Sequence, residues 1–183
     1  MLNFIKKHSN HESPLEHVQI TVHIIGISRA LSHQLVRHRI ASYSQMSQRY
    51  VKSEAPEYII PPSIAKNAEA HIKYEKILQR ITKCYNELTK LNISTEDARY
   101  VMPQATETKI IVSMNIRSWR HFFAERCCMK AQWEIRNVAN EILHQFKTLY
   151  PGIFENSGPR CLKYNKCLEN KPCNFFKGKI ENA

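Results

Sequence analysis

The stretch that decides the fold assignment is "RHRIASYSQMSQRY", residues 37–50. It brings three arginines, a histidine and three serines into fourteen residues and holds little that would build a core. A basic loop that touches nucleic acid non-specifically would carry interleaved aromatic residues or a continued lysine stripe. The polar groups here are instead varied and crowded, as convergent recognition of several phosphates and a polar ring requires.

The length and composition are those of an ordinary globular protein. The 183 residues predict one domain with at most a small appendage, and an apolar fraction of 43% allows a packed core. No run reaches the roughly eighteen apolar residues of a membrane span, and the N-terminus shows no secretory signal. We therefore expect a cytoplasmic protein that does not act on membranes. Its six cysteines are then thiols or metal ligands rather than disulfides.

The charge and the glycine count narrow the kind of partner. A net charge of +11 suggests an anionic partner such as nucleic acid, a nucleotide or a phosphorylated cofactor, with solubility alone as the other interpretation. The chain has only four glycines, at positions 26, 152, 158 and 178. A P-loop or a dinucleotide fingerprint needs several glycines in one turn, so both are excluded. Phosphates must be bound by side chains.

A strand and a helix are predicted before the opening stretch. In residues 16–25 every second side chain is apolar, which predicts a half-buried strand that Gly26 ends. Ser28 is placed to cap a helix through residues 29–39. On that helix Arg29, His33 and Arg37 would form one basic stripe.

The rest of the chain is predicted to be mostly helical. Apolar spacing and capping residues predict helices over residues 71–91, 94–102, 118–126 and 131–150. Residues 109–115 predict a strand, and residues 41–66 have the character of a loop. The elements show no βαβ rhythm, so we expect an α+β fold in which helices flank a mixed sheet.

One histidine motif and one cysteine pair contain the residue types of chemical sites. "HESPLEH", residues 11–17, does not have zinc-protease spacing, because its histidines are six apart and Pro14 interrupts a helix. It is either a polar turn or the edge of a site. Arg126 lies beside Cys127 and Cys128, where it could lower a thiol pKa. Adjacent cysteines on an amphipathic helix are nevertheless more often core residues.

The C-terminal tail, residues 156–183, is polar, lysine-rich and holds Cys161, Cys167 and Cys173. Five residues separate neighbouring cysteines, a spacing that matches no common zinc finger, and the tail offers no fourth ligand. Metal binding and a tail of reduced thiols both stay open, and we assign no metal site.

The opening stretch closely resembles the signature of the flavin-dependent thymidylate synthases. That signature runs Arg-His-Arg, two residues, Ser, one residue, Asn, two residues, Ser, one residue, Arg. The segments "HESPLEH", "DARYVMP", "NIRSWRHF" and "ERCCMKAQWEIR" also resemble family segments, in family order. The resemblance covers about residues 8–155. We therefore expect a catalytic domain over residues 1–155, short at its N-terminus, followed by the tail.

The resemblance implies reductive methylation of dUMP to dTMP, in dTMP biosynthesis. Methylenetetrahydrofolate donates the carbon, and a bound FAD, reduced by NADPH, carries the hydride. The resemblance also implies a homotetramer whose active sites are shared between subunits, and no cysteine nucleophile. We expect no nucleic-acid partner. The alternatives are a basic nucleic-acid-binding module and a catalytically impaired flavin-binding relative.

The resemblance also assigns site residues by position. The positions expected to bind FAD are Ser13, Arg37, His38, Arg39, Gln45, Asn115, Arg117, His121 and Lys130. The positions expected to bind dUMP are Gln34, Arg37, Gln45, Ser47, Gln48, Arg49, Arg99 and Arg126. Arg126 is the expected catalytic residue, which contacts and activates the uracil, and His11 is expected over the flavin and folate. Arginine stays charged in practice, so Arg126 can stabilise negative charge that develops on the ring.

Two departures from the family pattern bear on these expectations. Ser44 stands at the signature asparagine and does not have the amide's paired donor and acceptor, so we expect one flavin contact fewer. Only ten residues precede "HESPLEH", where relatives usually carry a strand and part of a helix. We therefore expect the fold to lack that strand, which would expose a sheet edge.

Overall fold

The computed structural model describes residues 12–50 and 55–173, and the chain divides into two compact units. The first unit is drawn from Met1–Thr21, Arg37–Ser42 and Ser113–Ala183, and the second from Val22–Val36 and Tyr43–Val112. The expected division into a catalytic domain over 1–155 and a tail stays a prediction. So does the expected lack of an N-terminal strand, because residues 1–11 lie outside the described residues.

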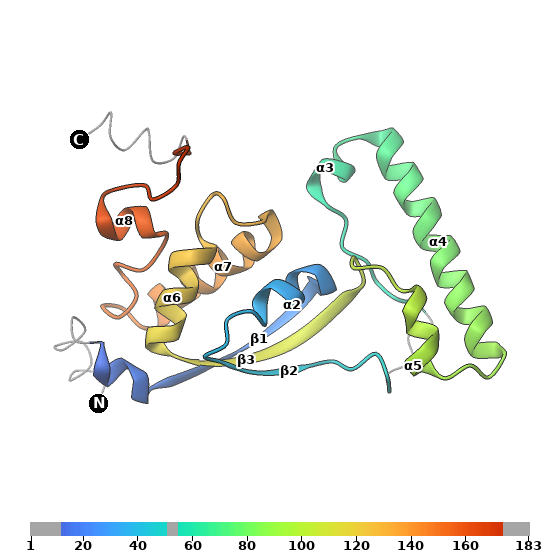
Figure 1. Cartoon of the computed structure of the whole chain (residues 1–183), viewed down its shortest axis with the longest axis horizontal. Coiled ribbons are helices and arrows are strands. Elements are labelled where there is room, and N and C mark those ends of the chain that lie inside the picture. The colour runs from blue at the N-terminus through green and yellow to red at the C-terminus, as the bar shows by residue number, and fades with distance from the viewer. Residues whose placement is uncertain (1–11, 51–54, 174–183) are drawn as a thin grey trace. The chain divides into compact units, whose positions relative to one another are not determined.

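A small antiparallel sheet in the order β1-β3-β2 organises the fold (Figure 1). Its strands are β1 (Gln19–Ser28), β2 (Ser42–Gln45) and β3 (Glu107–Asn115). The backbone N–H of Ile116 donates to Val18 at one end of the β1-β3 pair, and that of Arg29 donates to Thr106 at the other, both over 3.0 Å. Helices accompany this sheet in both units, which confirms the α+β class.

β1 does not end at Gly26, as the alternation predicted, but continues to Ser28. Gly26 has a φ of +71°, in the left-handed region that side-chain-bearing residues avoid. The buried positions also change phase there: Ile24 and Ile27 are buried, while Ile25 and Gly26 are exposed. One extra residue shifts the inward face in the same way as in a bulged strand. The broken alternation therefore marks a change of the buried face and not the end of the strand.

The second unit carries one strand-linked helix and one long amphipathic helix. Its helical elements are α2 (Arg29–Leu35), α3 (Pro62–Ala65), α4 (Ala68–Lys90), α5 (Thr95–Ala98) and the 3-10 turn η2 (Arg99–Val101). Ser28 caps α2 as predicted, and its hydroxyl accepts from the N–H of Leu31 over 3.0 Å. α2 ends at Leu35, four residues earlier than predicted, so Arg37 leaves the expected basic stripe.

The region predicted as a loop, residues 41–66, contains both β2 and α3. Tyr58 within it forms an isolated antiparallel bridge with Thr106, and its hydroxyl lies 2.8 Å from that of Thr82 on α4. Short elements of this kind have too few residues for a periodic pattern, and contacts to distant residues hold them in place. The loop prediction was wrong for these two elements.

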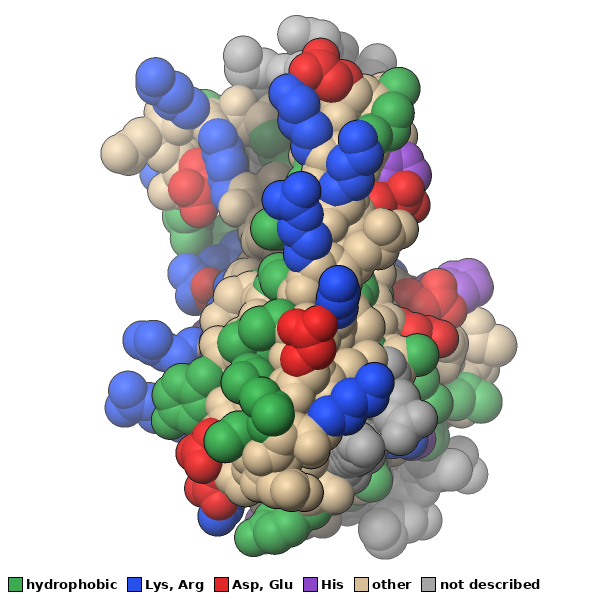
Figure 2. All heavy atoms as spheres, turned by 90° about the vertical axis from the view of Figure 1, so that its right-hand side faces the viewer, with side chains coloured by type: hydrophobic (Ala, Val, Ile, Leu, Met, Phe, Trp, Pro, Cys, Tyr) green, Lys and Arg blue, Asp and Glu red, His purple; other side chains and the backbone are tan. Residues whose placement is uncertain are grey.

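The predicted helices over 71–91 and 94–102 are confirmed as α4 and as α5 with η2. α4 is capped by Asn67 and buries Leu78 and Tyr85. Figure 2 shows basic side chains over this helix with acidic and apolar ones between them. Lys73 is paired with Glu69 over 2.6 Å. This face is a solvated helix surface and not an uninterrupted basic stripe.

The first unit packs its helices around an aromatic core. Its helical elements are η1 (Ser13–His17), α6 (Ile116–Arg126), α7 (Trp133–Leu149) and α8 (Arg160–Tyr164). Trp119, Phe122 and Phe123 of α6 are fully buried, and Trp119 stacks on Phe123 with ring centroids 5.8 Å apart. Phe146 of α7 meets Trp119 edge-to-face at 5.2 Å. Such pairs add to the free energy of burying the rings.

Two details of the predicted helices in this unit were wrong. α6 begins at Ile116 and is capped by Asn115, whose side-chain oxygen accepts from the N–H of Ser118 over 2.8 Å, so Ser118 is not the cap. Leu149 is one of the apolar residues whose spacing predicted the helix over 131–150, and it was expected to face the core, but it is 65% exposed. Over the described ranges 12–50 and 55–173, none of the helices is both long and apolar enough to cross a membrane.

Candidate active site

The expected catalytic residue in the first unit is joined to the signature histidine. Arg126 lies at the C-terminal end of α6, and its Nε donates to Nε2 of His38 over 2.9 Å. The His38 ring also meets Phe122 edge-to-face at 5.1 Å and lies 6.1 Å from the ring of His121. Residues far apart in the sequence therefore form one cluster. The resemblance assigned His38, His121 and Arg126 to the site, but it did not predict the hydrogen bond between Arg126 and His38.

Burial is the main cause of a low His38 pKa, and the positive charges of Arg126 and His121 lower it further, to about 4. A histidine normally titrates near 6.5, so His38 is neutral at neutral pH. Only a neutral imidazole has a ring nitrogen that accepts a hydrogen bond. The low pKa and the Arg126 contact therefore support the same protonation state.

Three other residues of this unit that were expected to bind FAD lie on η1 or at the start of α6. Arg117 on α6 pairs with Glu16 of η1 and with Glu12, the latter over 3.2 Å, and these carboxylates raise its pKa. Ser13 is exposed on the same η1 turn. Asn115 uses its side chain to cap α6. These contacts place Arg117 beside the turn that carries Ser13.

The remaining expected flavin residues of this unit present cations to solvent. Arg37, Arg39 and Lys130 are exposed. Exposed guanidinium groups are donors suited to a diphosphate, so the residues present fit a flavin dinucleotide. His11, expected over the flavin and folate, lies outside the described residues.

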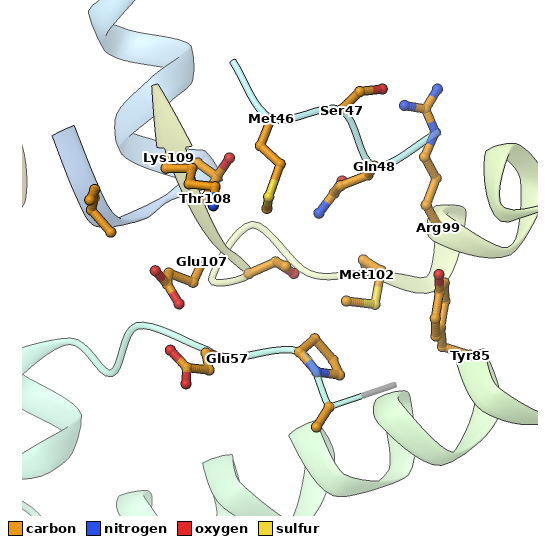
Figure 3. Close-up of a pocket in the computed structure, with 14 residues that line it drawn as sticks. Met46, Ser47, Gln48, Glu57, Tyr85, Arg99, Met102, Glu107, Thr108 and Lys109 are labelled. Atoms are coloured by element: carbon orange, nitrogen blue, oxygen red, sulfur yellow. The ribbon is translucent and has the colours of Figure 1, made fainter. Parts of the chain in front are cut away.

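In the second unit, three of the expected dUMP residues line one cavity of about 280 Å³. Ser47 and Gln48 come from the segment after β2, and Arg99 comes from η2 (Figure 3). Met46, Met102 and Tyr85 supply apolar wall. Hydroxyl, amide and guanidinium groups beside an apolar wall are the features of a site for a phosphorylated ring compound.

Three other expected site residues of this unit have partners within it. Arg49 is paired with Glu96 over 3.0 Å. The side-chain amide of Gln45 donates to the hydroxyls of Ser32 and Thr108, at 2.9 and 3.3 Å. The amide of Gln34 lies 3.4 Å from the carbonyl of Ala30 in α2. None of these three residues lines the 280 Å³ cavity.

Residues that sequence reasoning missed also surround this cavity. Glu57 and Glu107 both line it, and a hydrogen bond between their carboxyl groups, followed by burial and the charge of Glu57, raises the pKa of Glu107. Arg29 and His33 line a neighbouring hollow of about 230 Å³, to which Arg99 and Gln48 also contribute. Burial, with the charge of Arg99, lowers the pKa of Arg29. The stripe of Arg29 and His33 on one helix face was the only sequence signal for these residues.

Cys127, the first cysteine of the pair after α6, is unsuited to act as a nucleophile. Cys127 is buried, and burial raises its pKa to about 12 despite the opposing charge of Lys147. A thiol with such a pKa is protonated at neutral pH and is a poor nucleophile. Cys127 is therefore a core residue, the more common of its two interpretations.

Comparison with known proteins shows the family to which the chain belongs. Residues 1–152 match the model of a family described as thymidylate synthase complementing protein, and the chain belongs to that family. It is similar to the flavin-dependent thymidylate synthase of Nitratidesulfovibrio vulgaris, with 46% identity over 171 residues, 89% of this chain and 70% of the relative. The enzyme of the same name from Clostridium tetani is 47% identical over 171 residues, 85% of this chain and 69% of the relative. The one from Pyrococcus furiosus is 44% identical over 167 residues, 87% and 68% of the two chains.

Proposed function

We propose that this chain is a flavin-dependent thymidylate synthase that methylates dUMP to dTMP in the cytoplasm. FAD is the bound cofactor, NADPH the reductant and methylenetetrahydrofolate the carbon donor. The observation that carries the proposal is the family match over residues 1–152, which includes the stretch 37–50. The contacts of His38, Arg126 and Arg99 support it independently.

Arg126 has the role of stabilising charge on the uracil. Its guanidinium is held by His38, which stays neutral and accepts from it over 2.9 Å. A donor that is already oriented needs little reorganisation when negative charge develops beside it. His38 is then a positioning residue for Arg126.

Arg37, Arg39 and Lys130 hold the diphosphate of FAD, and Arg117 and His121 belong to the same flavin site. FAD supplies the hydride chemistry when it is bound. Side chains must carry the phosphate contacts, because the chain contains no glycine-rich phosphate loop. Gln45 donates a hydrogen bond to Thr108, and Asn115 caps α6. Through these contacts the two residues support the flavin site.

dUMP binds with Ser47, Gln48 and Arg99, the residues that line the larger cavity of the second unit. Arg99 takes the phosphate, and Arg49 joins it after exchanging the carboxylate of Glu96 for the ligand. The other positions expected to bind dUMP are Gln34, Arg37, Gln45 and Arg126. The apolar wall of Met46 and Met102 suits one face of a pyrimidine ring.

Assembly into a homotetramer with shared active sites is part of the proposal. Ile25 on β1 is 63% exposed and Ile111 on β3 is 42% exposed. Apolar side chains left exposed on a sheet are commonly covered by a partner subunit. Sedimentation equilibrium on the purified chain tests the assembly, and a monomer at micromolar concentration would contradict it.

The test of function begins with an absorption spectrum of the purified chain, repeated after excess FAD and desalting. Oxidised flavin bands that survive desalting and shift on addition of dUMP are the expected result. The holoprotein should then form dTMP from dUMP, methylenetetrahydrofolate and NADPH, detected by chromatography. No retained flavin, or flavin without dTMP formation, would contradict the proposal. Arg80→Ala, which removes an arginine from an exposed position of α4, is the control for arginine variants of the site and should keep both the flavin and dTMP formation.

The nucleic-acid-binding alternative has no support beyond net charge. Two lysines of α4 have acidic partners on the same helix, in the pairs Lys73–Glu69 and Lys83–Glu87. Arg37, the third member of the expected stripe, is not on α2. A duplex-binding surface would present unpaired cations along a continuous track.

A further inference from the structure

Two arginines of the second unit line the same hollow from different elements. Arg29 begins α2 and Arg99 begins η2, and both line the hollow of about 230 Å³ next to the proposed dUMP cavity. Both residues are half-buried. His33 lies one helical turn after Arg29 on α2 and adds an imidazole to the same wall. Side chains that donate hydrogen bonds to anions therefore meet in one space.

The backbone sets the convergence of the two arginines. The N–H groups of the first two residues of α2 donate to the carbonyls of Thr106 and Gln104, each over 3.0 Å. These hydrogen bonds hold the start of α2 beside the segment that joins η2 to β3. On η2 itself, Nε of Arg99 donates to the backbone carbonyl of Glu96 over 3.0 Å, which orients the guanidinium.

The positive charge in this hollow has no acidic side chain beside it. Of the described residues, those that line the hollow include no aspartate or glutamate. The acidic residues just before η2 are engaged elsewhere: Glu96 pairs with Arg49 over 3.0 Å, and Asp97 accepts from the hydroxyl that caps α5 over 2.9 Å. Burial, followed by the charge of Arg99, lowers the pKa of Arg29. An anion bound between the two guanidinium groups would offset their repulsion.

The larger cavity has its charges arranged to favour the same end. Figure 3 shows Glu57 and Glu107 on one side of the methionine wall and Arg99 on the other. An anionic group is repelled by the acidic end and attracted to the guanidinium. Arg99 and Gln48 line both hollows, so the smaller hollow continues the larger cavity at its cationic end.

We propose that the smaller hollow is a phosphate subsite, in which Arg29 and Arg99 bind one phosphate monoester between them and His33 donates a further hydrogen bond. A terminal phosphate has three oxygens that can accept from two guanidinium groups at once. The family resemblance assigned neither Arg29 nor His33 to a ligand. That the ligand is dUMP rests on the proposed function, whereas the phosphate subsite itself does not.

The first test compares a ligand that carries a phosphate with one that does not, on the full chain supplied with FAD. Isothermal titration measures the Kd of dUMP and of deoxyuridine for the wild type, Arg29→Ala and the control Arg80→Ala. We expect Arg29→Ala to raise the Kd of dUMP by about tenfold or more, because charged hydrogen bonds are lost, and to leave that of deoxyuridine unchanged. Arg80→Ala should match the wild type for both ligands.

His33→Glu tests the subsite without removing either arginine. His33 is exposed, and glutamate is a good helix former, so the variant should fold. The new carboxylate lies one helical turn from Arg29, where it can pair with the guanidinium in place of the phosphate. We expect the Kd of dUMP to rise by about tenfold or more. Circular dichroism checks both variants, and His33→Glu decides the matter if Arg29→Ala does not fold.

Inorganic phosphate separates this proposal from the proposed function. If the wild type binds dUMP, an unchanged Kd in the folded variants overturns the subsite, and so does an equal weakening of dUMP and deoxyuridine in Arg29→Ala. If the wild type binds no dUMP, the proposed function fails and the phosphate ion decides. Phosphate should then raise the Tm of the wild type, relative to chloride at equal ionic strength, more than that of either variant. Equal stabilisation of all three proteins, or none, overturns the proposal.

Discussion

Arg126 Nε donates a hydrogen bond of 2.9 Å to Nε2 of His38. The two residues come from the end of α6 and from the "RHR" segment, and their contact requires a neutral imidazole. Protonation of His38 would place two positive charges within hydrogen-bonding distance. The contact therefore makes the first unit sensitive to acid at one identifiable residue.

Acid should weaken the fold through His38. Its pKa is about 4 in the folded chain and near 6.5 in the unfolded chain, so between these values the unfolded state binds more protons. Its contribution to the free energy of unfolding is fully present above pH 6.5 and is lost as the pH falls towards 4. The loss is on the order of 1 kcal/mol after allowance for partial exposure. Urea unfolding of wild type and His38→Gln between pH 7.5 and 4.5 measures it. Equal pH slopes for the two proteins would contradict this assignment.

Replacing Arg126 by alanine should abolish methylation while FAD stays bound. Loss of one aligned charged donor typically lowers kcat by about 10²–10³. The nearby positive charge also disappears, so the pKa of His38 should rise from about 4 towards its ordinary value. Turnover, flavin absorbance after desalting and the histidine NMR titration measure the three effects. Loss of the flavin in Arg126→Ala would contradict the assignment of Arg126 as the catalytic residue. Arg80→Ala serves as the control.

Arg99→Ala should weaken dUMP binding and leave the flavin in place. Arg99 lines both hollows of the second unit, where a guanidinium suits a phosphate. We expect an increase in Kd of about tenfold or more, since charged hydrogen bonds contribute about 1.5–3 kcal/mol. Isothermal titration of the holoprotein with dUMP measures the change. The Kd of Arg99→Ala for dUMP should also depend less on salt concentration. An unchanged Kd would contradict the assignment of Arg99 to the dUMP site.

Cys127 should be unreactive and dispensable for turnover. Its pKa of about 12 leaves little thiolate at pH 8, whereas Cys84 is exposed. Mass spectrometry after brief iodoacetamide treatment should find Cys84 modified and Cys127 intact. Cys127→Ala should still form dTMP, and a loss of turnover in a folded Cys127→Ala protein would revive the nucleophile hypothesis.

Gly26→Ala should destabilise the chain through the backbone alone. A Cβ at this position meets no atom within 4 Å, but the φ of +71° is strained for a side-chain-bearing residue. The expected cost is about 1–2 kcal/mol in the free energy of unfolding. Gly26→Asn should cost less, because asparagine tolerates this region better. Urea denaturation compares the two variants, and equal losses would point to a steric cause.

Much of the fold could be read from local patterns. The alternation in β1, the β-rich run of β3, the apolar spacing of α4 and α7 and the cap at Ser28 all depend on residues near one another in the chain. The signature at residues 37–50 identified the family, because its spacing is rarely met by chance. These features are local, so the sequence by itself determined the class of fold and the family.

Other features were decided only by tertiary structure. The change of the buried face at Gly26, the early end of α2 and the contact of Arg126 with His38 all depend on distant residues. A local pattern cannot predict them, because packing brings these groups together only after the chain has folded. Burial then sets the pKa of His38 near 4 and that of Cys127 near 12, values that no sequence spacing encodes.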